Sequence, residues 1–205
     1  MKEIIFGDIE KRSFEIIEKE VSVKPFQGKE WLILRRMIHA SADFELLSLV
    51  RFHKDAVSSG IEALKRGCFI FTDTKMALSG IRKEKLKRLG CKIRCFLGKK
   101  EVKKMASEKG LPRSYVAVDF SVPYINGGIY VIGNSPTALI RVVELVEKGI
   151  CLPSLIIGMP VGFVNVSQAK EMLVNQNKVP YITVIGRKGG TALAVAAINQ
   201  LIEFV

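Results

Sequence analysis

A unit that recurs in the second half of the chain limits the fold more than any other feature of the sequence. It consists of a short apolar run rich in β-branched residues, a loop containing glycine or proline, and a stretch with helical spacing. The runs are IYVIG (129–133), LIIG (155–158) and YITVIG (181–186). Strands that are apolar on both sides belong in a parallel sheet with helices on both faces. We therefore predict an α/β fold, a three-layer α/β/α domain around a mostly parallel sheet.

Similar patterns predict the remaining elements. Continuous apolar runs at 68–73, 91–98 and 115–120 are expected to be strands. Helices are expected in the segments that follow the three recurring runs. Other segments with helical spacing are 8–20, 58–66, 74–81, 83–90 and 100–110. Because no change in composition marks a linker, residues 1–205 are predicted to form a single domain.

Residues 31–52 contain His39, one of only two histidines in the chain. Apolar residues at three- and four-residue spacing predict a helix here; they are Trp31, Leu34, Ile38 and Ala42. Asp43 is suited to cap a second helix, whose apolar face would contain Phe44, Leu47 and Val50. His39 would then lie near a helix end, where the backbone can approach a ligand closely.

The sequence leaves the chemistry of His39 open. Histidine has an ordinary pKa of about 6.5, which suits proton donation close to neutral pH. A purely structural role fits a single histidine equally well. His53 is interpreted as a surface residue. Asp43, Asp73 and Asp119 are candidates for orienting His39 or contacting a substrate, and nothing in the sequence selects among them.

The charge balance indicates an anionic partner. Lysine and arginine outnumber aspartate and glutamate by 32 to 20, which gives a net charge of +12. Nucleic acid, anionic lipid and a small molecule with several carboxylates would all be attracted. The basic residues are dispersed, acidic residues are mixed in at 82–88 and 99–104, and only 8% of residues are aromatic. A nucleic-acid partner is therefore disfavoured.

Other function classes lack their characteristic patterns. The four cysteines, Cys68, Cys91, Cys95 and Cys151, do not have the paired spacing of a zinc site, so no metal site is expected. The chain contains no nucleophile-elbow, dinucleotide-binding or P-loop motif. No apolar run reaches the ~18 residues of a membrane span, and the N-terminus does not resemble a signal peptide. We expect a cytoplasmic protein without a membrane partner.

Loops at the carboxyl ends of parallel strands gather on one rim, where ligands bind. Four loops should meet there: 73–76, 133–137, 158–165 and 186–191. Ser135 and the following proline suit the start of a helix whose free N–H groups could hold an anion. Arg187 and Lys188 add positive charge, and Phe163 could lie against a flat ligand. The ligand-binding candidates in these loops are Asp73, Asn134, Ser135, Thr137, Gly162, Phe163, Arg187, Lys188, Gly189 and Gly190.

Four long motifs, in order along nearly the whole chain, resemble the precorrin-8X methylmutase family of the cobalamin pathway. They are RRMIHASADFE (35–45), GNSPTAL (133–139), LPSLIIGMPVGFV (152–164) with a following AKE, and GRKGGTALAVAAIN (186–199). The departures are modest. Ser135 stands where the family usually has alanine, and VSQAKE replaces a pattern closer to AESKE. These changes concern local substrate contacts and not the reaction.

The resemblance implies a flavodoxin-like fold, a homodimer and migration of a methyl group from C-11 to C-12 of a corrinoid. The reaction would convert precorrin-8X or cobalt-precorrin-8 into hydrogenobyrinate or cobyrinate, with His39 as the catalytic proton donor. Ser13 and Arg113 would also reach the pocket, and Arg113, expected at the start of a strand, could clamp a carboxylate. No cofactor would be needed, since any cobalt is carried by the substrate. The product could be handed to the next pathway enzyme.

Two alternatives remain open from the sequence. A corrinoid-sequestering protein would bind the same ligand tightly without isomerising it. A basic nucleic-acid-binding domain would show a steep salt dependence of affinity and is the weakest candidate. The resemblance does not indicate whether the substrate contains cobalt.

Overall fold

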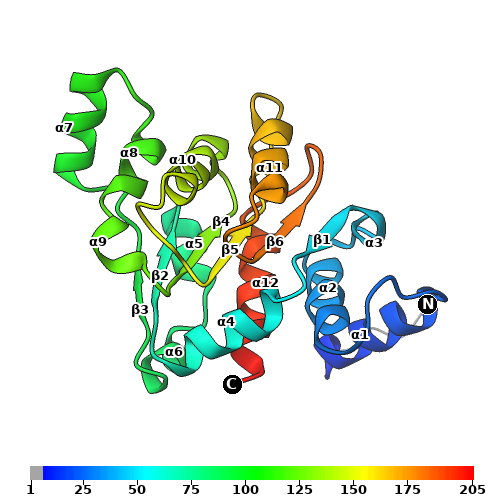
Figure 1. Cartoon of the computed structure of the whole chain (residues 1–205). Helices are drawn as coiled ribbons and strands as arrows, with labels where there is room; N and C mark the ends of the chain where they lie inside the picture. The colour runs from blue at the N-terminus through cyan, green and yellow to red at the C-terminus, as the bar shows by residue number, and fades with distance from the viewer. Residues whose placement is uncertain (1–6) are drawn as a thin grey trace.

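Six short strands form one sheet in the order β1-β6-β5-β4-β2-β3 (Figure 1). The structure is a computed structural model that describes residues 7–205; residues 1–6, part of the N-terminus predicted not to be a signal peptide, lie outside the described part. β1 runs antiparallel to β6, and every other pairing is parallel. The strands are β1 (Val50–Phe52), β2 (Phe69–Thr72), β3 (Lys92–Arg94), β4 (Ile129–Ile132), β5 (Leu155–Gly158) and β6 (Tyr181–Val184).

The parallel strands have the order of a flavodoxin-like fold. Counted along the chain from β2, they lie in the order 2-1-3-4-5. The chain places β3 on one side of β2 and then continues to β4 on the other side, so the winding direction reverses between β2 and β4. In open α/β sheets, ligands bind outside the carboxyl ends of the strands at such a reversal. The predicted three-layer α/β fold is confirmed.

Helices cover both faces of the sheet because successive strand residues point to opposite sides. Ile129 and Val131 of β4 pack into one core cluster, whereas Tyr130 and Ile132 pack into the other. The first face carries α1 (Ile9–Glu20), α2 (Gly28–Ser41), α3 (Leu46–Leu49), α4 (Ala56–Lys65), α6 (Lys83–Arg88) and α12 (Thr191–Glu203), with α5 (Lys75–Gly80) packed on α12. The second face carries α7 (Lys100–Lys109), α8 (Arg113–Asp119), α9 (Val122–Ile125), α10 (Pro136–Glu147) and α11 (Val166–Asn175).

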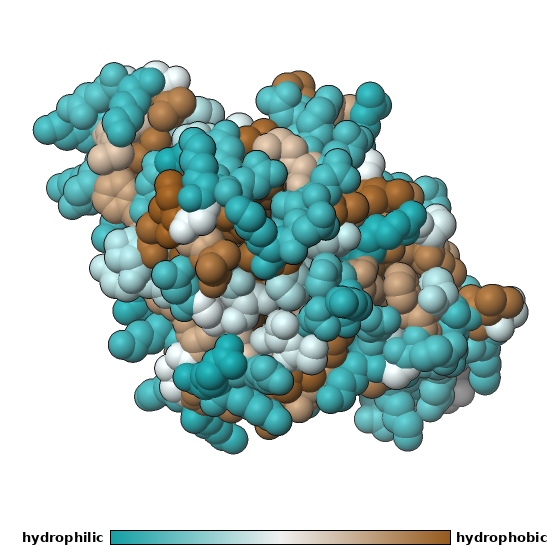
Figure 2. Space-filling view, viewed as in Figure 1, coloured by the Kyte–Doolittle hydropathy of each residue, from teal (hydrophilic) through white to brown (hydrophobic). Residues whose placement is uncertain are grey.

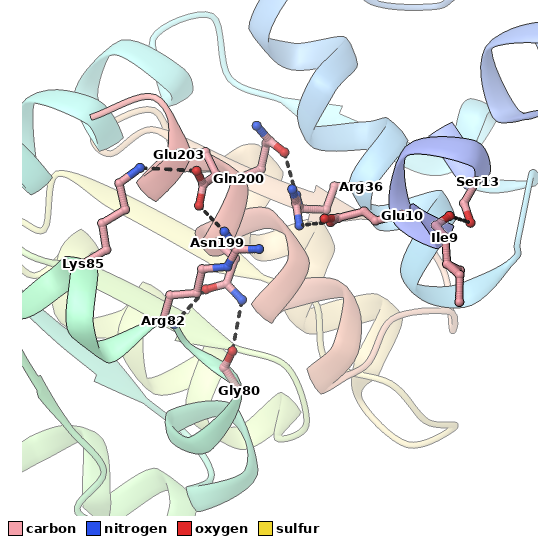
Figure 3. A network of polar contacts seen from close by, with 10 residues as sticks. All are labelled: Ile9, Glu10, Ser13, Arg36, Gly80, Arg82, Lys85, Asn199, Gln200 and Glu203. Carbon is pink, nitrogen blue, oxygen red and sulfur yellow. Dashed lines mark hydrogen bonds and ion pairs between the residues drawn. The ribbon is translucent and has the colours of Figure 1, made fainter. Parts of the chain in front are cut away.

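The C-terminal helix α12 is central to the first layer and lies alongside α2 (Figure 1). Its far end is tied to the α5–α6 region by polar contacts (Figure 3). Asn199 donates to the carbonyl of Gly80 at 3.0 Å and accepts from the backbone N–H of Arg82 at 3.0 Å. Glu203 pairs with Arg82 and Lys85. These contacts hold α12 in a fixed position relative to the strands that it covers.

The predicted strand at 115–120 is wrong, because most of this segment belongs to helix α8. Its run of β-branched residues has the composition of a strand, and local sequence does not separate the two states. Tertiary contacts favour the helix. Tyr115 and Asp119 are four residues apart, and both bond to Arg141 of α10 at 3.2 and 2.7 Å. Arg113 therefore lies in the first turn of a helix and not at the start of a strand.

The predicted second helix after His39 is much shorter than expected. Asp43 does accept a backbone N–H bond, from Glu45 at 3.0 Å, but the helix that follows covers only four residues, Leu46–Leu49. Val50, expected on its apolar face, begins strand β1 and pairs with Val184 of β6. This edge strand could not be predicted from local periodicity, because three residues are too few to show a period of two. Likewise, only Lys92–Arg94 of the run 91–98 is a strand.

The short helix α9 was not predicted, and the other helices agree with the predicted segments to within a few residues. All four cysteines are free. Cys151 is buried, and Cys68, Cys91 and Cys95 are partly exposed. Within residues 7–205, no helix combines the length and apolar character needed to cross a bilayer.

Candidate functional site

Asp73 joins the first two rim loops. It follows β2, is buried, and its carboxylate accepts the backbone N–H groups of Asn134 and Ser135 at 2.8 Å each and of Gly133 at 3.3 Å. Burial raises the pKa of Asp73 above its ordinary value, although the three N–H bonds act in the opposite direction. The loops after β2 and β4 are therefore fastened together at the point where the winding direction reverses.

The third and fourth loops are joined through their backbones. The N–H of Gly190 donates to the carbonyl of Met159 at 2.8 Å, and the N–H of Gly162 donates to the carbonyl of Arg187 at 3.3 Å. The approach is so close that a Cβ on Gly189 would lie 2.4 Å from the carbonyl oxygen of Pro160. Only glycine fits at this position.

One contact joins the two pairs of loops. A Cβ on Gly133 would lie 2.6 Å from the Cα of Thr191, so the loop after β4 touches the start of α12. The four loops therefore form one continuous surface at the carboxyl ends of the parallel strands, as the sequence predicted.

A hollow of about 260 Å³ lies at the reversal point between β2 and β4. It brings together four of the predicted ligand-binding residues, Asp73, Arg113, Asn134 and Ser135. Thr137 lies beside it, and its hydroxyl group hydrogen-bonds to the hydroxyl groups of Ser114 at 2.8 Å and Ser135 at 3.0 Å. Ser135 Oγ accepts the N–H of Ala138 and caps α10, as expected. A cation, hydroxyl groups and a helix start are suited to a carboxylate.

A second hollow, of about 250 Å³, contains His39 and Ser13. It lies between α1 and the end of α2, and its other walls are Ile16, Ile17, Glu20, Ile38, Ala42 and Phe44. His39 is partly exposed, and the ring of Phe14 packs against its imidazole edge to face with 5.3 Å between the centroids. Within residues 7–205, no protein group forms a hydrogen bond to this imidazole. The hollow is smaller than a macrocycle, so a large flat ligand would lie across it.

The wall formed by α1 is held against α2 by partly buried and exposed polar contacts. Glu18 accepts from Trp31 Nε1 and from Arg35, both at 2.8 Å. Arg36 bonds to Glu10 of α1 at 2.9 Å and to Gln200 of α12 at 2.6 Å (Figure 3). Ser13 Oγ donates to the carbonyl of Ile9 at 2.7 Å, which leaves its lone pairs free to accept from a ligand. The position of Ser13 relative to His39 depends on these contacts.

The segment after His39 is tied to the fourth rim loop. Lys188 Nζ lies 2.8 Å from Asp43 and 2.9 Å from Glu45. This pairing lowers the pKa of Asp43 and raises that of Lys188. The other candidates for orienting His39 also have different partners, since Asp73 holds backbone N–H groups and Asp119 holds Arg141. None of the three carboxylates hydrogen-bonds to His39 in the described part of the chain.

Phe163 is the most exposed apolar side chain of the rim, with 83% of its surface accessible. The Arg187 guanidinium lies 5.5 Å from the centre of its ring. Hydrophilic residues cover most of the face in Figure 2, and apolar residues show between them. An exposed aromatic ring beside a cation is suited to a flat anionic ligand.

Two larger hollows contain none of the predicted site residues. One, of about 520 Å³, lies among Arg82, Lys83, Lys85, Arg88 and the end of α12. The other, of about 570 Å³, lies along α1 beside Glu10, Glu15 and Arg35. Volume alone therefore does not locate the site. We place it at the rim and at the hollow of His39, which the Lys188–Asp43 pair joins to the rim, because the predicted site residues are there.

Sequence analysis missed three neighbours of the site. Phe14 lies in the segment 8–20 that was predicted to be helical, and Ser114 follows Arg113, but neither was predicted to be a site residue. Lys170 lies in the AKE motif and is buried beneath the fourth loop. Its burial could have been predicted from its place among the apolar and small residues of a helix.

Comparison with known proteins identifies the family. The family model for precorrin-8X methylmutase matches residues 8–204. The cobalt-precorrin-8 methylmutase of Leptospira interrogans is 40% identical over 202 residues, covering 95% of this chain and 92% of the relative. The precorrin-8X methylmutase of Pseudomonas aeruginosa is 36% identical, covering 94% and 93%. The crystal structure of precorrin-8X methylmutase from Thermus thermophilus superposes with a TM-score of 0.88 at 40% identity, covering 96% of this chain and 94% of that one.

The match in sequence extends over nearly the whole chain and agrees with the match in fold. The rim loops and the segment around His39 lie inside the matched range. This chain therefore belongs to the precorrin-8X methylmutase family and is an isomerase.

Proposed function

We propose that the protein moves a methyl group from C-11 to C-12 of precorrin-8X or its cobalt form, with His39 as proton donor. The observation that carries the proposal is the partly exposed His39, free of hydrogen bonds to described protein groups, in the same hollow as Ser13. The product would be hydrogenobyrinate or cobyrinate. Relatives named for precorrin-8X and for cobalt-precorrin-8 are 36% and 40% identical to this chain, so the proposal covers both substrates.

The reaction requires little from the protein beyond binding and a proton. In a sigmatropic shift the bond from C-11 to the methyl carbon breaks as the bond to C-12 forms, and the mass is unchanged. Donation of a proton from His39 to the conjugated ring makes it more electron-poor and lowers the barrier, and a proton is returned when the product forms. One well-placed acid contributes roughly 10²–10⁴-fold, and holding the ring in its reactive geometry adds to this. No metal or cofactor of the protein takes part, and any cobalt belongs to the substrate.

The rim supplies the rest of the proposed site. The macrocycle carries acetate and propionate groups, which Arg113, Arg187, Lys188 and the start of α10 would attract. The ring would lie across the hollow of His39 with Phe163 against its flat face. We further propose that the chain acts as a homodimer in the cytoplasm and passes its product to the next pathway enzyme.

The test is to incubate the protein with each substrate and follow the absorption spectrum and the mass. We expect a corrin spectrum at unchanged mass, and His39→Asn should lose turnover by about 10²-fold or more while keeping its fold. His53→Asn is the matched control, because His53 lies between β1 and α4, and it should retain turnover. Full turnover in His39→Asn would remove this residue from the mechanism. Tight binding of the substrate without isomerisation would favour the sequestering alternative.

A further inference from the structure

Lys170, on α11, is a charged residue buried inside the protein, with 1% of its surface exposed. Its Nζ donates to the carbonyl oxygens of Gly186 and Lys188 at 2.9 and 2.5 Å. Burial lowers the pKa of Lys170 to about 8. Burying an ammonium group costs free energy that an apolar side chain of the same length would avoid. In return, the ammonium group forms two hydrogen bonds to the loop that an apolar side chain could not form.

These bonds fix a loop that regular structure does not hold. Gly186 and Gly190 have φ angles of +72° and +126°, so the chain between β6 and α12 leaves the strand conformation. Its carbonyl groups point away from the sheet ladder and need donors from elsewhere. Lys170 supplies two such donors from beneath, while Met159 accepts the N–H of Gly190 from the side.

The same loop reaches the residues that follow His39. The backbone of Lys188 is held by Lys170, and its side chain pairs with Asp43 and Glu45 at 2.8 and 2.9 Å. Asp43 comes directly after Ala42, which ends α2 with a φ of +52° and donates its N–H to the carbonyl of Ile38. A shift of the loop would thus be passed to the end of the helix that carries His39.

We infer that Lys170 is a positioning residue, which sets the 186–190 loop and, through the Lys188–Asp43 pair, the end of α2 that carries His39. It is buried and lines neither the hollow of His39 nor the hollow beside Ser135. The effect on catalysis rests on the proposed role of His39, but the positioning itself can be measured without substrate.

The direct test uses the NMR signals of the two histidines in the protein labelled with ¹³C-histidine. Lys170→Met keeps an unbranched side chain that is one atom shorter and removes the charge and the hydrogen-bond donors. We expect the C2–H signal of His39 to shift and that of His53 to stay. The matched control is Lys178→Met, which also removes a bond from a lysine to a carbonyl, that of Glu147 at 2.6 Å, but at the amino end of β6. It should move neither signal. An unchanged His39 signal in folded Lys170→Met would overturn the inference.

A second variant covers the case in which Lys170→Met does not fold. Lys188→Met changes a side chain that is 42% exposed and leaves Lys170 in place. It should also shift the His39 signal, and an unchanged signal would overturn the proposed link. When Lys170→Met is added to the Lys188→Met protein, it should shift the His39 signal less than it does in the protein that keeps Lys188. Equal shifts in both backgrounds would show that Lys170 does not act through Lys188.

Turnover provides the catalytic readout. We expect Lys170→Met to lower kcat roughly 10- to 100-fold, the effect of a small displacement of a catalytic group, with a smaller change in KM. Unchanged kcat would overturn the catalytic part of the inference. If the His39 signal moves while His39→Asn retains turnover, the positioning stands and the proton-donor role fails.

Discussion

At the scale of single residues, Asp73 has the clearest structural role at the rim. Its carboxylate is the acceptor for three backbone N–H groups, and we expect Asp73→Ala to lower the free energy of unfolding by about 2–5 kcal/mol because those groups lose their partner. Asp73→Asn, which keeps one oxygen, should cost less. Urea unfolding measures both, and Asp55→Ala, at an exposed aspartate, should stay within about 0.5 kcal/mol. Equal stability of Asp73→Ala and this control would contradict the role.

At the scale of elements, the packing of α1 on α2 should depend on pH through Glu18. Burial raises the pKa of Glu18, but hydrogen bonds from Lys24, Trp31 and Arg35 outweigh it and lower the pKa from 4.5 to about 2. Because the folded pKa is the lower one, ionised Glu18 stabilises the protein above pH 4.5, and this contribution is lost as the pH falls toward 2. We expect Glu18→Gln to lower the free energy of unfolding by about 1–3 kcal/mol at neutral pH.

The measurement is urea unfolding of the two proteins at neutral and acidic pH. The difference in stability between them should shrink below pH 4.5 and be nearly gone near pH 2. Glu15→Gln changes an exposed residue of the same helix and should have little effect at any pH. A difference that stays constant into acid would show that the carboxylate charge is not what holds α1.

At the scale of the whole molecule, the net charge of +12 should act on substrate binding. Between about 20 mM and about 300 mM salt the screening length falls from about 20 Å to about 6 Å. We expect KM for the anionic corrinoid to rise roughly 3- to 10-fold over this range, with kcat nearly constant, because long-range attraction is screened. Arg187→Gln should flatten the dependence. A KM that does not change with salt would show that the net positive charge of the protein does not contribute to substrate binding.

The amino-acid sequence determined the layers and the rim. The recurring apolar runs indicate strands that are buried on both faces. The three-layer fold and the positions of the four rim loops could therefore be predicted from the repeating pattern. The helix that carries His39 and the capping role of Ser135 followed from equally local signals. Substrate contact by the individual candidates stays a prediction, although the structure brings Arg113, Asn134 and Ser135 to one hollow and Ser13 with His39 to another.

The tertiary structure alone decided what depends on contacts between distant segments. Most of the segment 115–120 is helical because Tyr115 and Asp119 both bond to Arg141 of α10. Val50 lies in a strand because it pairs with β6. The adjacency of β2 and β4 places Asp73 under the loop of Ser135. Lys170 likewise meets the loop of Lys188 only after folding. Local periodicity reports which side of an element is buried, but not which element covers it.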